Sequence, residues 1–260
     1  MDIKPSLEEL KKFANLIANE SAEITMNYFR KSINIEDKND NSPVTVADKN
    51  SELKMRKMIN KEYPNHGIIA EEFENFKIDS DYLWVLDPID GTKSFIAGHK
   101  DFGTLIALLY KKEPLLGIID CPAHNERWIG QNNLKTTLNG KNIETSSKDK
   151  IEDCYVITSG LYFENEDFKK GFDKIKNKSK FCKFGGDCYM YGMLASGLID
   201  IVIEDTLKVH DYMALIPVIQ GAGGIVSDRF GKKISLDSDG SFVATCSELL
   251  HNKVIEILNN

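Results

Sequence analysis

The chain has few cysteines, and their pattern fits neither a zinc ribbon nor a disulfide-stapled domain. There are five, an odd number, and no CxxC motif occurs among them. Structural zinc sites usually use closely spaced cysteine pairs, and small secreted domains usually carry an even set. We therefore expect neither class, and the composition favours a reducing cytoplasm.

Long apolar runs are missing as well. No stretch of 18 consecutive apolar residues occurs, and the first residues, Met1 to Lys12, contain acids and no apolar core of signal-peptide length. A transmembrane helix needs about 20 predominantly apolar residues, and a signal peptide needs its own apolar core. We expect a soluble protein with no membrane partner.

Excess positive charge is absent. The chain has 33 lysines and arginines against 40 aspartates and glutamates, which gives a formal net charge of −7. The most lysine-rich stretch, Lys169 to Lys183, mixes lysine with apolar and acidic residues, as is typical of a solvated helix face. Because nucleic-acid backbones are bound through basic patches, we expect no nucleic-acid partner.

Several nucleotide-binding and hydrolase motifs are also missing. No Walker-type GKS or GKT, no HExxH and no GxSxG occurs. The glycine-rich run Gly221 to Gly224 follows a predicted helix instead of opening one, so we interpret it as a helix C-cap and turn. The five histidines show no ligand spacing, and we interpret each as a surface or loop residue: His66, His99, His124, His210 and His251. We interpret His210 as merely adjacent to a candidate site residue.

Hydrophobic periodicity predicts an α+β half over residues 1–145. Ser6 and Glu9 have capping-box spacing, so a first helix should reach about Phe29, and Thr45 with Asp48 should open a second. Short apolar runs then predict one antiparallel-rich sheet, with strands at 67–70, 82–86, 102–109, 115–120 and 126–129, and a turn at residues 139–140.

Residues 146–260 predict an α/β half. The expected strands are 155–158, 199–203, 225–227 and 242–246, and the expected helices are 167–175, 188–195 and 211–219. A chain of 260 residues can form one large domain or two intimate halves. We expect stacked layers of helices and sheets that act as one catalytic unit.

The most informative stretch is WVLDPIDGTKSF, from Trp84 to Phe95. It ends a predicted buried strand in two carboxylates, Asp87 and Asp90, and Pro88 should break the strand so that both acids emerge at its carboxyl end. Gly91 and Thr92 can then open a helix or turn whose backbone N–H groups point at an anion such as phosphate. The pattern predicts a metal site beside a phosphate site.

Turn chemistry alone is the alternative interpretation, because Asp, Pro and Gly are common turn residues. A second acidic pair, Glu71 and Glu72, ends another short apolar strand, and two acidic strand ends favour a metal site over a plain turn. Glu72 should face the opposite side of an extended strand from Glu71, which predicts a structural or outer role for it.

Four blocks follow one another along the chain: SPVTVAD (Ser42 to Asp48), AEE (Ala70 to Glu72), WVLDPIDGTKSF, and GGDCY with LKVHDYMALIPVIQGAGG (Leu207 to Gly224). In this order they resemble the inositol monophosphatase superfamily of metal-dependent phosphomonoesterases. Three segments are most similar to its histidinol-phosphatase branch: FGTLIALL (Phe102 to Leu109), GIIDCPAHNERWIG (Gly117 to Gly130) and GGDCYMY (Gly185 to Tyr191). The resemblance implies a layered α/β/α/β/α fold and a homodimer.

The resemblance also implies a set of metal ligands. One ion would be held by Glu71, Asp87 and the backbone carbonyl of Ile89, and a second by Asp87, Asp90 and Asp211, with Asp87 bridging. Oxygen-only ligands suit Mg²⁺, so we expect two or three Mg²⁺ ions, with Mn²⁺ as a substitute. Converging carboxylates without a cation would repel one another and take up protons. Asp211 on its own fits an ordinary helix cap equally well.

Catalytic and substrate residues follow from the same resemblance. Thr92 and Asp48 would orient the attacking water, and capping is the alternative role for Asp48. Asp187 and Glu204 would lie near the alcohol part of the substrate. An acid at position 187 suits a cationic ammonium group, and a helix cap is again the alternative.

The sequence thus predicts a phosphomonoesterase that hydrolyses histidinol phosphate by attack of an activated water. An inositol or related sugar monophosphatase is the second hypothesis. A catalytically silent regulatory protein of the same fold is the third, although a binding protein has no need to keep like charges crowded together.

Overall fold

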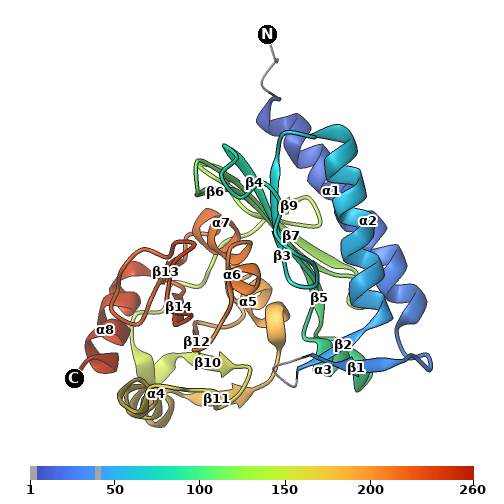
Figure 1. Cartoon of the computed structure of the whole chain (residues 1–260). Coiled ribbons are helices and arrows are strands. Elements are labelled where there is room, and N and C mark those ends of the chain that lie inside the picture. Colours follow the sequence, from blue (N-terminus) through green and yellow to red (C-terminus); the bar gives the residue numbers. More distant parts are fainter. Residues whose placement is uncertain (1–4, 39–41) are drawn as a thin grey trace.

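The computed structural model describes residues 5–38 and 42–260, which form alternating layers of helices and sheets (Figure 1). The first half begins with helix α1 (Leu7–Tyr28), the hairpin β1 (Ile35–Asp37) and β2 (Pro43–Thr45), and helix α2 (Val46–Glu62). Both helices carry the predicted capping boxes, at Ser6 with Glu9 and at Thr45 with Asp48.

A seven-stranded sheet follows, with strand order β3-β4-β5-β6-β7-β8-β9. All of its neighbouring pairs are antiparallel except β3 with β4. The strands and the short helix α3 span β3 (Gly67–Ala70), β4 (Tyr82–Asp90), α3 (Thr92–Ile96), β5 (Gly103–Tyr110), β6 (Glu113–Cys121), β7 (Glu126–Gln131), β8 (Thr137–Leu138) and β9 (Lys141–Asn142).

The second half contains a five-stranded mixed sheet with strand order β11-β10-β12-β14-β13. Its elements are a 3-10 turn (Ile151–Asp153), β10 (Tyr155–Thr158), α4 (Glu166–Lys178), β11 (Phe181–Phe184), α5 (Asp187–Ala195), β12 (Ile201–Glu204), α6 (Val209–Tyr212), α7 (Leu215–Gly221), β13 (Ile225–Ser227), β14 (Phe242–Thr245) and α8 (Glu248–Leu258).

Side-chain alternation along the strands assembles these layers. On β4, Trp84 and Leu86 pack with α1 and α2, whereas Leu83 and Val85 face α5, α6 and α7. On β12, Val202 faces α5, α6 and α7 as well, and we call these three the middle helices. Its neighbours Ile201 and Ile203 face α4 and α8. The order is therefore helix pair, large sheet, middle helices, small sheet, helix pair, and the predicted α/β/α/β/α layering is confirmed (Figure 1).

The middle helices lie very close to the large sheet. A Cβ atom on Gly117 would come within 2.1 Å of the Ala214 carbonyl oxygen, and one on Gly130 within 2.2 Å of the Pro217 carbonyl oxygen. Only glycine permits this approach of backbone to backbone. Because the same helices also contact the small sheet, both halves share one core, and the division at residue 145 stays a prediction.

Two predicted boundaries are wrong. Pro88 does not end its strand: β4 continues to Asp90, with an irregular register between Asp87 and Asp90, because a bulge can accommodate the missing N–H group. The expected helix over 211–219 is two helices, α6 and α7. In a continuous helix, residue 217 would donate its N–H to the Met213 carbonyl, and Pro217 has no N–H. Proline is tolerated in the first turn of α7, because the N–H groups of a first turn have no partner within the helix.

Several elements were not predicted at all. The strands of the β1–β2 hairpin are three residues each, too short for apolar alternation to reveal them; β1 is exposed, whereas Val44 and Thr45 of β2 are buried. Strand β11 is a mostly exposed edge strand. Helix α8 is amphipathic and capped by Ser247, a pattern that is typical of a helix although no helix was predicted there. The expected C-cap and turn after α7 is confirmed, since Gly223 has φ +98° and Gly224 donates its N–H to the Ile219 carbonyl.

Among the helices of residues 5–38 and 42–260, none combines the length and apolar character needed to cross a membrane.

Candidate active site

The end of β4 supplies the centre of the site. The Asp87 side chain is buried and accepts a hydrogen bond from the Ile89 N–H at 3.0 Å, which fixes its direction in the bulge. Asp90 accepts the N–H of Cys188 at 2.5 Å, so the start of α5 holds this second acid. Gly91 then adopts φ +82° as the N-cap of α3, and Thr92 is the first helical residue.

Asp48 reaches the same place from the first turn of α2. Its Oδ2 atom accepts both the N–H and the hydroxyl of Thr45, at 2.8 and 2.5 Å, which is the capping role. Its Oδ1 atom lies 3.4 Å from the Thr92 hydroxyl, which also lies 3.1 Å from the Ile89 carbonyl. The structure thus brings together the two members of the predicted dyad, and Asp48 caps its helix as well.

Glu71 and Glu72 lie in a bend just after β3, not in an extended strand. Both carboxylates bind the ammonium group of Lys38, each at 2.7 Å, so the prediction that Glu72 faces away from Glu71 is wrong. The bend is held from α2 by Glu52, whose carboxylate accepts the N–H groups of Glu72 and Phe73 at 2.7 and 3.1 Å. The prediction assumed that side chains alternate between the two faces of a strand at positions 71 and 72. It is wrong because β3 ends at Ala70.

Asp211 enters from α6, where it is the third helical residue and not the N-cap. Its Oδ2 atom accepts the Lys208 N–H at 2.7 Å, so it does help to cap the helix. The preceding residue, His210, is 8% exposed, and its Nε2 atom lies 3.4 Å from Asp211 Oδ1.

Two groups of ligand atoms converge within 4.8 Å of one another: those of Asp87, Asp90 and Asp211, and those of Glu71, Asp87 and His210. The first group contains the same three side chains that the sequence predicted for one ion. The second shares Glu71 and Asp87 with the other predicted set and adds an imidazole. Carboxylates that share one site in this way are suited to a hard divalent cation.

Burial and mutual repulsion act together on these acids. The pKa of Asp87 is raised well above its ordinary value, first by burial and then by the charges of Glu71 and Asp90. The pKa of Asp90 is also raised, by burial and by the charges of Asp187 and Asp211. A cation that occupied the site would remove this penalty, so the residues present fit a bound metal.

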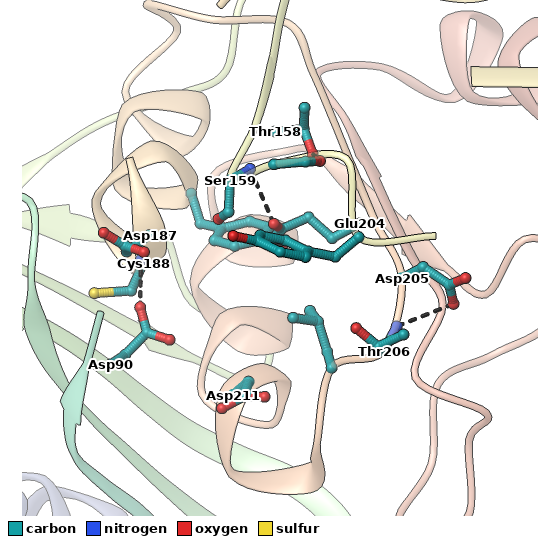
Figure 2. Close-up of a pocket in the computed structure, with 13 residues that line it drawn as sticks. Asp90, Thr158, Ser159, Asp187, Cys188, Glu204, Asp205, Thr206 and Asp211 are labelled. Carbon is teal, nitrogen blue, oxygen red and sulfur yellow. Dashed lines mark hydrogen bonds between the residues drawn. The ribbon is translucent and has the colours of Figure 1, made fainter. Parts of the chain in front are cut away.

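A pocket of about 190 Å³ opens beside Asp90 and Asp211 (Figure 2). Its lining includes five acidic residues, Asp90, Asp187, Glu204, Asp205 and Asp211, and no lysine or arginine from the part of the chain that the structure describes. The carboxylate of Asp205 points away from the pocket and accepts the N–H groups of Thr206 and Glu164. The remaining lining is aromatic, hydroxylic and small: Thr158, Ser159, Gly160, Tyr162, Cys188, Tyr191, Thr206 and Leu207.

The two predicted substrate residues both lie in this pocket. Glu204 accepts hydrogen bonds from the Tyr191 hydroxyl at 2.7 Å and the Ser159 N–H at 3.0 Å, and burial raises its pKa to about 7. Asp187 accepts the Ser94 hydroxyl at 2.5 Å. The N-cap of α5 is Gly186, so the interpretation of Asp187 as an N-cap is wrong.

Asp187 also packs against Gly91, which with Thr92 forms the predicted phosphate site. A Cβ atom on Gly91 would lie 2.8 Å from the Asp187 carboxyl carbon, so glycine is required there both for its positive φ and for this contact. The substrate pocket and the predicted phosphate site are therefore neighbours. The role of the Gly91 and Thr92 N–H groups in phosphate binding stays a prediction.

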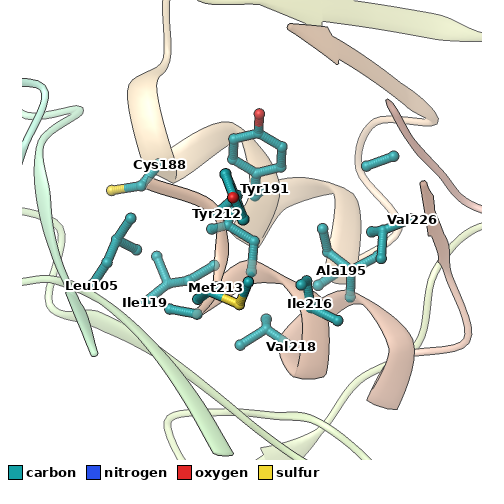
Figure 3. Close-up of a cluster of buried hydrophobic side chains, with 14 of the residues drawn as sticks. Leu105, Ile119, Cys188, Tyr191, Ala195, Tyr212, Met213, Ile216, Val218 and Val226 are labelled. Atoms are coloured by element: carbon teal, nitrogen blue, oxygen red, sulfur yellow. The ribbon is translucent and has the colours of Figure 1, made fainter. Parts of the chain in front are cut away.

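The helices that carry these acids rest on a shared hydrophobic cluster (Figure 3). Tyr191 of α5 and Tyr212 of α6 both belong to it, and both rings contact Phe242, with centroids 5.5 and 6.3 Å away. Met213, between α6 and α7, and Leu105 and Ile119 of the large sheet belong to the same cluster. Because this packing leaves little freedom to α5 and α6, Asp187 and Asp211 are held in fixed positions.

The histidines were interpreted wrongly in three cases, since His66, His210 and His251 are buried. His66 stacks between Tyr63 and Tyr82 and accepts the Trp84 indole N–H at 3.1 Å. His251 bonds two buried hydroxyl groups. Spacing in the sequence cannot reveal His210 as a site residue, because the acids that surround it come from other elements.

Comparison with known proteins agrees with this geometry. The model of the inositol monophosphatase family matches residues 6–260. The chain is 47% identical to the bifunctional phosphatase IMPL2, chloroplastic, of Arabidopsis thaliana, over 91% of this chain and 70% of that protein. It is 30% identical to a histidinol-phosphatase of Chlorobaculum parvum, over 86% and 87% of the two chains. The structure of an inositol monophosphatase from Zymomonas mobilis superposes with a TM-score of 0.89 at 38% identity, over 99% and 100% of the two chains.

Proposed function

Because the chain belongs to the inositol monophosphatase family, we propose that it is a Mg²⁺-dependent phosphomonoesterase that hydrolyses histidinol phosphate to histidinol and phosphate. Its substrate would be a small-molecule ester whose phosphate lies at the acids of β4 and whose alcohol part enters the pocket beside them.

The acidic lining of that pocket is the observation that favours histidinol phosphate over an uncharged sugar phosphate. Two of the acidic residues that line it, Asp187 and Glu204, belong to neither converging group of ligand atoms. A neutral polyol has no charge for these acids to complement, whereas the ammonium group of histidinol can form charge-assisted hydrogen bonds with them. Asp187 suits this role because Ser94 fixes one of its oxygens at the pocket wall.

We assign the cations to the acids that converge at the end of β4. Asp87, Asp90 and Asp211 would hold one ion, and Glu71, Asp87 and the Ile89 carbonyl would hold a second, with Mn²⁺ as a substitute for Mg²⁺. When bound, such ions neutralise phosphoryl oxygens and lower the pKa of a water molecule.

The protein's own part in the proton transfer falls to Thr92 and Asp48. The Thr92 hydroxyl would accept a proton from the attacking water as it passes its own toward Asp48 Oδ1, 3.4 Å away. The Thr45 contacts hold Asp48 in place, so the dyad is built before the substrate arrives.

Two alternatives remain distinct from this proposal. An inositol or sugar monophosphatase is supported by the close similarity of the fold to the Zymomonas mobilis enzyme. A catalytically silent protein is disfavoured, because Asp87 is buried among other acids at a cost that binding alone does not require. A homodimer and a cytoplasmic location stay predictions.

The test is phosphate release from a panel of esters with Mg²⁺, in the parent protein and in Asp187→Asn. The parent should prefer histidinol phosphate to inositol 1-phosphate. The variant keeps the side-chain size but loses the charge, so kcat/KM for histidinol phosphate should fall roughly ten- to a hundredfold.

Glycerol 2-phosphate is the internal control, because it has no ammonium group and should lose little activity in the same variant. Equal losses of kcat/KM for both esters would show that Asp187 does not recognise the ammonium group. A parent that prefers inositol 1-phosphate would support the sugar phosphatase, and one that hydrolyses no ester would support the silent protein.

A further inference from the structure

An imidazole lies beside the acids of the site and has no part in the mechanism above. His210 is the second residue of α6, next to Asp211, and it is 8% exposed. One of its ring nitrogens and one carboxylate oxygen each from Glu71 and Asp87 lie within 4.8 Å of one another.

We propose that His210 is a nitrogen ligand of the cation that Glu71 and Asp87 hold. This inference rests on the proposed metal dependence and deepens it, because the ligand set of that ion changes from oxygen alone to oxygen and nitrogen.

The distances agree with a shared ion. Metal–ligand bonds of about 2.0–2.2 Å place two ligand atoms on opposite sides of one ion about 4.0–4.4 Å apart, and adjacent ligands closer. Three atoms within 4.8 Å of one another all lie within about 2.8 Å (4.8/√3) of one point, so each needs to move by at most about 0.7 Å to bind an ion there.

Among residues 5–38 and 42–260, the one polar contact that the structure records for the ring is with Asp211. Its Nε2 atom lies 3.4 Å from Asp211 Oδ1, which is longer than the 2.7–2.9 Å of a charge-assisted hydrogen bond. Asp211 has its own partner in the Lys208 N–H, and the neighbouring Tyr212 donates its hydroxyl to the Ser235 carbonyl. Among the described residues, the carboxylates of Glu71, Asp87 and Asp211 lie beside the imidazole, and the Lys38 ammonium group binds Glu71 at 2.7 Å.

A nitrogen ligand changes which metals bind well. Imidazole favours later transition metals, and the general order of affinity rises from Mn²⁺ to Co²⁺, whereas carboxylate sites suit Mg²⁺. His210 should therefore raise the affinity for Co²⁺ more than that for Mg²⁺.

Pulsed electron paramagnetic resonance of the Mn²⁺-loaded protein detects a nitrogen ligand directly and does not depend on enzymatic activity. With one and two equivalents of Mn²⁺, the parent should show ¹⁴N modulation, which becomes that of ¹⁵N when its histidines are labelled. His210→Gln should bind Mn²⁺ and lose the modulation. His99→Gln, at an exposed position, is the matched control and should keep it.

Calorimetry supplies the second readout. The Co²⁺ dissociation constant of His210→Gln should rise about tenfold or more, and that of Mg²⁺ by less than about threefold. A parent that binds Mn²⁺ without nitrogen modulation would overturn the ligand role of His210 and leave the proposed metal-dependent function intact. A parent that binds no divalent ion would overturn both.

Discussion

The acids of the site come from several segments of the chain, and hydrogen bonds hold them in place. Thr45 holds Asp48, the Cys188 N–H holds Asp90, and Ser94 holds Asp187. These contacts offset part of the repulsion between the acids and keep them aimed at a common volume. At the scale of single residues, preorganisation by hydrogen bonds is what distinguishes the site from a chance cluster of acids.

The Thr92 hydroxyl provides the first residue-scale prediction. Thr92→Ala should lower kcat by roughly 10²–10⁴-fold, because the hydroxyl acts only while the proton moves. The metal dissociation constants should change little, since Thr92 is not among the converging ligand atoms. Steady-state kinetics and calorimetry measure the two effects separately.

Thr92→Ser is the matched control, because it keeps the hydroxyl and should keep kcat within about an order of magnitude of the parent. If Thr92→Ala retained kcat within about twofold, the dyad of Thr92 and Asp48 would have no catalytic role.

The sequence predicted these residues to different degrees. Asp87, Asp90 and Thr92 could be found because one local motif contains them all. Glu71 and Asp211 needed the family resemblance, since a carboxylate after a strand or at a helix start is common. His210 and Glu52 could not be predicted, because their partners lie on elements that only the tertiary fold brings near them.

At the scale of elements, helix α2 positions one of the predicted metal ligands from a distance. Its residue Glu52 is completely buried and accepts the N–H groups of Glu72 and Phe73, and Arg56 on the same helix binds it at 2.6 Å. The bend that presents Glu71 therefore depends on a charge that lies outside the site.

Glu52→Gln should weaken this support, because an amide is a poorer acceptor and leaves the Arg56 charge without its partner. We expect the free energy of unfolding to fall by about 1–3 kcal/mol. We also expect KM for Mg²⁺ to rise about tenfold while kcat at saturating Mg²⁺ changes less. Metal titrations of activity, together with urea unfolding, measure these effects.

Glu20→Gln removes another glutamate, one that pairs with Lys54 of α2 at the surface, and should leave KM for Mg²⁺ unchanged. A KM for Mg²⁺ in Glu52→Gln equal to that of the parent would show that Glu52 stabilises the fold without positioning Glu71.

Elements were predictable where periodicity and caps agreed, as in α1 and α2. They were not predictable where tertiary packing decides, as in the split between α6 and α7. There, the close approach of α7 to Gly117 and Gly130 fixes the helix axis, and Pro217 fixes where it begins. The hairpin β1–β2 lacked an apolar pattern because its strands are only three residues long and β1 is exposed.

At the scale of the whole molecule, buried acids couple stability to pH. Burial raises the pKa of Glu204 from its ordinary 4.5 to about 7. Between these values the folded chain holds a proton that the unfolded chain releases, so the stabilisation is present below the unfolded pKa and is lost as the pH rises through 7. The same sign applies to Asp87 and Asp90.

Urea unfolding in the presence of chelator tests this coupling. Between pH 5.5 and 8 the parent should lose about 2 kcal/mol more of its unfolding free energy than Glu204→Gln, whose amide does not titrate. Glu8→Gln, at an exposed position of α1, should keep the slope of the parent. Equal slopes in the parent and Glu204→Gln would mean that Glu204 is ionised throughout.

The central claim is that the converging carboxylates hold the cations on which hydrolysis depends. Phosphate release from histidinol phosphate, measured against free Mg²⁺ after treatment with chelator, tests it most directly. We predict no turnover without a divalent cation and a saturable return as Mg²⁺ is added. Asp90→Asn should remain at least about a hundredfold below the parent at saturating Mg²⁺, because it lacks a charged ligand. Full turnover by the metal-free parent would contradict the account.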